Sequence, residues 1–160
     1  MKNGARTLII GLGNPLLRDD GVGLHIVAAL RDRVLPEGTE CAEDTHGGLR
    51  LMERMIGFDR VVVVDALLSG AEPGTIQQLP LDGRPTRHSA STHDVDLPTA
   101  LDVGRRSGAK LPPNDAVQLI GIEAEDVETF GETMTPAVAA AIPRAVEAVL
   151  AALARNREAT

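Results

Sequence analysis

Three side chains that could do chemistry stand where predicted secondary-structure elements begin or end. Asp20 follows a glycine-rich turn after the apolar residues 8–10, and Asp65 follows the four valines at 61–64. His93 lies in a polar segment just before a predicted helix. Two carboxylates and one imidazole suit a borderline divalent ion such as zinc or nickel, with coordination positions left open. The sequence therefore predicts a candidate metal-contacting site at Asp20, Asp65 and His93.

Each of these residues also has a structural explanation. A carboxylate at a helix N-terminus accepts hydrogen bonds from free backbone amides, which accounts for one residue of the 19–20 aspartate pair. We expect Asp19 to be this cap and Asp20 to be the functional residue. An aspartate after a buried strand can be a turn residue, and a histidine in a loop can be ordinary polar surface, so Asp65 and His93 keep these alternatives.

A nucleotide-binding turn is the main competing interpretation of the glycine-rich segment. A dinucleotide fingerprint needs a third glycine three positions after Gly13, where this chain has Leu16. Pro15 has no amide hydrogen to offer a phosphate, and the aspartate pair would place negative charge where an anion should bind. The turn is therefore better suited to a cation than to a phosphate.

Hydrophobic periodicity and turn residues divide the chain into alternating strands and helices. Four consecutive valines that do not alternate with polar residues indicate a central strand covered on both faces. The next strand follows too closely for a parallel crossover, so we expect an antiparallel edge strand there. The predicted strands cover residues 8–12, 39–43, 60–65, 75–79 and 117–122. The predicted helices cover residues 21–34, 49–56 and 97–103, with a last one capped by Thr135 and bent or restarted at Pro143.

This order of elements predicts an α/β fold. We expect a three-layer α/β/α sandwich around a twisted, mostly parallel sheet of about five strands, formed by residues 1–160 as a single domain. Loops that follow parallel strands gather at the carboxyl edge of such a sheet. That topology is what would bring Asp20 and Asp65 to the same edge.

The composition excludes several classes of partner. The net charge is −7, and the chain has no Trp or Tyr, so nucleic acid would find neither a basic groove nor stacking rings. We expect no membrane insertion, because no segment approaches the apolar length that a bilayer requires, and no signal peptide precedes the first strand. A single cysteine, Cys41, excludes a disulfide within the chain. These features predict a cytoplasmic protein.

The motifs together resemble a known family, the hydrogenase maturation endopeptidases. The resemblance rests on residues 11–23, 63–66, 91–97 and 131–136, in that order along the chain. It implies that Asp20, Asp65 and His93 take the places of the family's metal-contacting acidic residue, aspartate and histidine. These are the three residues reached above from topology.

The resemblance also implies an activity. Members of this family remove the C-terminal peptide of the large-subunit precursor of a nickel–iron hydrogenase after nickel has been inserted. The nickel, carried by the precursor, serves as the recognition signal, and the protease itself is expected to hold no metal tightly. The alternative is a hydrogenase accessory protein that binds nickel without cutting a peptide, since the same three ligands would serve it.

The remaining histidines and one acidic segment receive no functional role. The family often has an acidic residue, glycine and threonine after its second strand, and this chain departs from that pattern at residues 43–48. We therefore carry no role onto Glu43, Asp44 or His46. His25, on a predicted helix, and His88, in a polar loop, are expected to be surface residues.

Overall fold

A five-stranded sheet forms the centre of the computed structural model, which describes residues 4–81, 86–88 and 95–155. The strands lie in the order β2-β1-β3-β5-β4. Every neighbouring pair is parallel except β4 with β5, which confirms the predicted antiparallel edge strand. The strands are β1 (Thr7–Leu12), β2 (Thr39–Asp44), β3 (Arg60–Leu67), β4 (Ile76–Pro80) and β5 (Val117–Glu123).

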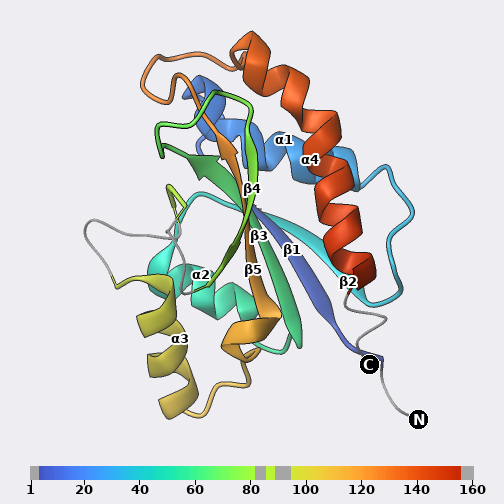
Figure 1. The fold of residues 1–160 in the computed structure, drawn as a ribbon. Coiled ribbons are helices and arrows are strands. Elements are labelled where there is room, and N and C mark those ends of the chain that lie inside the picture. Colours follow the sequence, from blue (N-terminus) through green and yellow to red (C-terminus); the bar gives the residue numbers. More distant parts are fainter. Residues whose placement is uncertain (1–3, 82–85, 89–94, 156–160) are drawn as a thin grey trace.

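Helices cover both faces of the sheet and give the predicted three-layer α/β/α arrangement. Helices α1 and α4 pack on one face, and α2 and α3 lie on the other (Figure 1). The α-helices are α1 (Val22–Leu30), α2 (Gly48–Met55), α3 (Leu97–Arg106) and α4 (Pro136–Arg155), and two short 3-10 helices are η1 (Arg18–Gly21) and η2 (Asn114–Ala116).

The valines of β3 explain why this strand lies in the middle of the sheet. Val62 and Val64 are fully buried in the cluster that includes α1 and α4. Val61 and Val63 are equally buried in the cluster that includes α2 and α3. Because alternate side chains of a strand point to opposite faces, a strand covered on both sides needs an apolar residue at every position. The prediction of a central strand is confirmed.

Two helices differ from the prediction at their ends or interior. Helix α1 ends at Leu30 rather than at residue 34, and the side chain of Val34 is 98% exposed. The amides of Asp32 and Arg33 bond to carbonyls three residues back, a tightened final turn that closes the helix. Helix α4 is a single element through Pro143 and does not restart there.

Helix α4 also differs from the expectation about apolar segments. By length and composition alone it could cross a bilayer, a property that its many alanines confer. However, one of its faces is buried against α1 and the sheet, where Val138, Val146 and Val149 belong to the apolar cluster. In this structure α4 is therefore a helix of the protein core.

Candidate active site

Asp20 lies in η1, directly before the start of α1 in the chain, and only 1% of it is exposed. Its Oδ2 atom accepts a hydrogen bond from the Asn14 amide (2.9 Å), and its Oδ1 atom accepts one from Arg87 Nε (2.5 Å). The glycine turn brings the chain close enough for these contacts. Gly13 has a φ of 154°, and a Cβ on it would lie 2.1 Å from the Asp20 carbonyl oxygen. Only glycine allows these two backbone segments to lie so close together.

Asp65 lies near the carboxyl end of β3 and is completely buried. Its Oδ1 atom accepts a hydrogen bond from the Ala66 amide (2.8 Å), and its Oδ2 atom accepts one from the His88 amide (2.5 Å). A buried carboxylate needs such donors, because loss of hydration would otherwise cost several kcal/mol. The carboxylate is therefore held in one orientation at the carboxyl edge of the sheet.

The His88 ring joins the two carboxylates. Its Nδ1 atom lies 2.8 Å from Asp65 Oδ1, and its Nε2 atom lies 3.3 Å from Asp20 Oδ2. Burial of the ring lowers its pKa, but the hydrogen bonds and negative charges of Asp20 and Asp65 raise it more, to about 10. His88 is therefore an imidazolium at neutral pH. The prediction that it is a surface residue is wrong.

The charges in this cluster compensate one another. Burial raises the pKa of Asp20, but the hydrogen bond and charge of His88, the Asn14 amide and Arg87 together lower it below its ordinary value. Arg87 is fixed by its own backbone, since its amide donates to the Ala66 carbonyl (2.9 Å). Two buried carboxylates thus face two cations, and all the strong contacts of the cluster are charge-assisted.

The structure brings together two of the three predicted site residues. Asp20 and Asp65 meet through His88, as the parallel topology predicts. His93 lies outside the described residues. Within residues 4–81, 86–88 and 95–155, no three His, Cys, Asp or Glu side chains are grouped as a metal site.

Sequence reasoning missed Arg87 and His88, and one signal could have pointed to them. Two carboxylates buried at a sheet edge require cationic partners, and the polar loop after β4 offers four candidates in sequence, Arg84, Arg87, His88 and His93.

Asp19 does not cap the helix that follows it, contrary to the prediction. It is fully buried, and its Oδ2 atom accepts hydrogen bonds from the amides of Glu125 and Asp126 (both 2.9 Å). Thr135 donates to it twice, through its amide and through its hydroxyl (both 2.7 Å). All four donors belong to the loop between β5 and α4. Asp19 therefore fastens that loop to the segment that carries Asp20.

The acidic segment after β2 holds its own turn together. Asp44 is 8% exposed, and its Oδ1 atom accepts hydrogen bonds from the amides of Thr45 (2.7 Å) and His46 (3.2 Å). Burial raises its pKa, but these amides, the His46 ring and the Arg50 charge bring it below the ordinary value. The His46 side chain is 60% exposed, and Glu43 pairs with Arg31 (2.6 Å). These contacts are local and do not involve Asp20 or Asp65.

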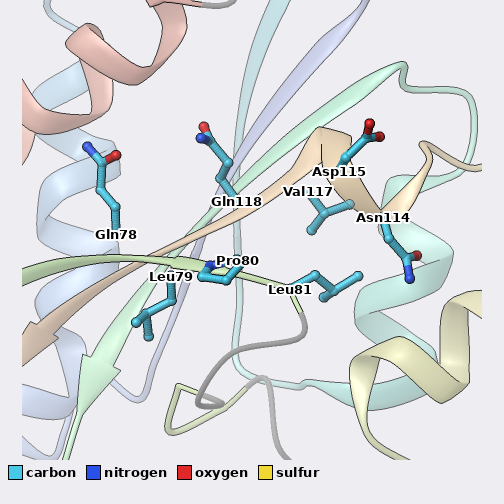
Figure 2. Close-up of a pocket in the computed structure, with 8 residues that line it drawn as sticks. All are labelled: Gln78, Leu79, Pro80, Leu81, Asn114, Asp115, Val117 and Gln118. Atoms are coloured by element: carbon cyan, nitrogen blue, oxygen red, sulfur yellow. The ribbon is translucent and has the colours of Figure 1, made fainter.

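A pocket of about 530 Å³ lies at the opposite edge of the sheet. Figure 2 shows that its lining comes from the end of β4, the start of β5 and η2. Val117 and Gln118 in this lining pair with Val61 and Val62, whereas the site lies beside Asp65, farther along β3. The pocket is therefore separate from the carboxylate cluster.

Comparisons with known proteins agree with the fold and the motifs. The sequence profile of the family described as hydrogenase maturation protease matches residues 24–152. The hydrogenase 2 maturation protease of Escherichia coli K12 is 34% identical over 152 residues, which cover 92% of this chain and 90% of that protein.

Solved structures give the same result. The hydrogenase maturating endopeptidase HybD from E. coli superposes with a TM-score of 0.75 at 32% identity, covering 94% of this chain and 93% of that chain. A hydrogenase 2 maturation peptidase from a Thaumarchaeota archaeon gives a TM-score of 0.67 at 26% identity, covering 92% and 97% of the two chains.

The fold and the site define an α/β/α protein with a buried carboxylate pair at the carboxyl edge of a mostly parallel sheet. Within that class, the chain belongs to the hydrogenase maturation protease family. It is therefore a hydrolase of the endopeptidase type, as its motifs predict.

Proposed function

We propose that this protein removes the C-terminal peptide from the large-subunit precursor of a nickel–iron hydrogenase, in the cytoplasm, after nickel has been inserted. The observation that carries the proposal is the buried pair Asp20 and Asp65, which lie at the carboxyl edge and share one imidazole. Carboxylates of this kind can contact a borderline metal ion that a substrate brings with it.

The nickel in the precursor acts as the recognition signal in this proposal. In the free protein, the two carboxylates are occupied by Arg87 and His88. Nickel contact therefore requires these cations to give up at least part of their contacts. The resemblance assigns His93 as the third nickel contact, and no metal is held tightly by the protein alone.

Peptide-bond cleavage follows once the precursor is in place. A water molecule attacks the scissile carbonyl, a carboxylate that has lost its cationic partner accepts the proton of this water, and the proton then passes to the amide nitrogen as the C–N bond breaks. Asp20 and Asp65 therefore serve both to contact the nickel and to position the reaction. The buried surroundings of both side chains keep their orientation fixed.

Mass spectrometry of the precursor tests the proposal. Nickel-loaded and nickel-free precursors are incubated with the protein, and the expected result is loss of a C-terminal peptide from the loaded precursor alone. Asp65→Asn and Asp20→Ala should abolish the cleavage, whereas Glu43→Gln, a change to an acidic residue paired with Arg31, should not. Binding of the loaded precursor without shortening would favour the non-proteolytic accessory protein. Equal cleavage of both precursors would refute nickel as the signal.

A further inference from the structure

Large apolar side chains are exposed around the candidate active site. Seven such side chains are exposed in the described part of the chain. Four of them lie at the carboxyl edge of the sheet, because they follow β1, β2, β3 and β5: Leu16, Leu49, Leu68 and Phe130. Phe130 is 79% exposed, although an aromatic ring of this size is usually placed where it can bury area.

Leu16 and Phe130 come from segments that are paired through their backbones. The Gly131 amide donates to the Leu16 carbonyl (2.8 Å), and the Arg18 amide donates to the Gly131 carbonyl (2.8 Å). In Figure 1 the orange loop between β5 and α4 lies at the same end of the molecule as the blue segment before α1. The two exposed side chains therefore belong to one surface, which we call the apolar platform.

The apolar platform is held rigidly. Arg18 Nε donates to the Thr133 carbonyl (2.9 Å), and Arg18 also pairs with Asp126 (3.3 Å). Asp19 adds its four hydrogen bonds to the same loop, and Val127 anchors the loop in the core. A surface whose backbone is already ordered loses less conformational entropy when a partner covers it.

The platform is continuous with the catalytic carboxylates and is bordered by negative charge. Leu16 and Asp20 are four residues apart in a single hydrogen-bonded turn, in which Asn14 bonds to both of their segments. The loop 124–134 contains no Lys or Arg, and all three of its glutamates, at 125, 128 and 132, are exposed. A partner that covers the platform must therefore offer an apolar hollow bordered by basic side chains.

We propose that the apolar platform, centred on Leu16 and Phe130, is the surface on which the hydrogenase large-subunit precursor docks. The inference rests on the proposed function, and it adds where the precursor binds and what its contact surface carries. Phe130 inserts into an apolar hollow of the precursor, and basic side chains of the precursor face the glutamates of the loop. This contact places the nickel-bearing end of the precursor over Asp20 and Asp65.

Steady-state cleavage of the nickel-loaded precursor tests the docking surface. Phe130→Asp should raise KM by about tenfold or more and leave kcat within about twofold, because the contact is made away from the reacting bond. Phe130→Ala should act in the same direction but less strongly. The matched control is Val34→Asp, a change at a 98% exposed apolar residue after α1, which should leave both constants unchanged.

A second experiment tests the charge of the partner. Replacing the three exposed glutamates of the loop together by glutamine should raise KM about threefold at low ionic strength and have no effect at 0.5 M salt. Glu37→Gln, at an exposed position before β2, is the control. An unchanged KM for Phe130→Asp, with the urea midpoint of wild type, would overturn the docking surface while leaving the proposed function intact.

Two other outcomes would also overturn the inference. Failure of the wild-type protein to bind or shorten any loaded precursor would remove the proposed function, and the precursor would no longer be the occupant of the platform. A wild-type dimer in sedimentation that Phe130→Asp dissociates would show that a second copy of this chain covers the surface instead.

Discussion

His88 should make the stability of this protein depend on pH in a definite direction. The pKa of its ring is raised from 6.5 to about 10 in the folded state. A group whose pKa is raised by folding stabilises the fold fully at pH values below its pKa in the unfolded chain. This stabilisation is lost as the pH rises towards its pKa in the folded protein. Each pH unit between the two pKa values corresponds to about 1.4 kcal/mol of unfolding free energy, so the whole interval corresponds to about 5 kcal/mol. The ring is 18% exposed, so solvent screens these contacts only weakly.

The perturbation is His88→Ala, and the assay is urea unfolding at several values between pH 7 and 9. The wild type should lose about 3 kcal/mol of unfolding free energy relative to the variant over this range. Cys41 has a thiol pKa that burial raises, partly offset by Arg31, but it is present in both proteins, and its effect cancels in the difference. His25→Ala, at an exposed histidine of α1, is the control and should follow the wild type. A difference between His88→Ala and wild type that stays constant with pH would refute this reasoning.

Two further substitutions test the parts that position the site. Asp19→Asn puts an amide group against four hydrogen-bond donors and should lower the free energy of unfolding by about 3 kcal/mol or more, with faster hydrogen exchange in the loop after β5; a loss below about 1 kcal/mol would contradict the fastening role. Gly23→Ala should destabilise by about 3 kcal/mol in the same urea assay, because its Cβ would lie 2.4 Å from the Val64 carbonyl oxygen. Gly4→Ala, where a Cβ would meet nothing within 4 Å, is the control and should have no measurable effect, whereas equal effects of the two would refute the close-packing argument.

The sequence predicted those features that a local pattern determines. The run of valines required a strand covered on both faces, and the short connection after β3 indicated an antiparallel edge strand, which in the structure pairs with β5. The prediction that Asp20 and Asp65 lie at the same edge of the sheet was possible because it depends only on the direction of parallel strands. These inferences needed no knowledge of which side chains meet.

The contacts that sequence reasoning missed are all formed across long separations in the chain. Asp19 bonds to residues more than a hundred positions away, and no local spacing distinguishes that role from helix capping. The sequence-based assignments of His93 and His88 used only their neighbours in the chain, but the position of His88 depends on the hydrogen bond of the Arg87 amide to Ala66 and on the contact of its own ring with Asp65. These tertiary contacts leave no periodic signal in the sequence.

The way in which Asp19 fastens the loop after β5 separates two kinds of evolutionary constraint. Glu125 and Asp126 are bound to Asp19 through their backbone amides, so these two contacts do not depend on which side chains stand at these positions. Only Thr135 contributes a side chain. The exposed residues of the loop, Glu128, Phe130 and Glu132, can therefore change in size and charge while Asp19, Asp126 and Val127 keep the frame that holds Asp20 in place. Related proteins could therefore differ in the partner that this loop recognises while Asp20 and its reaction stay unchanged.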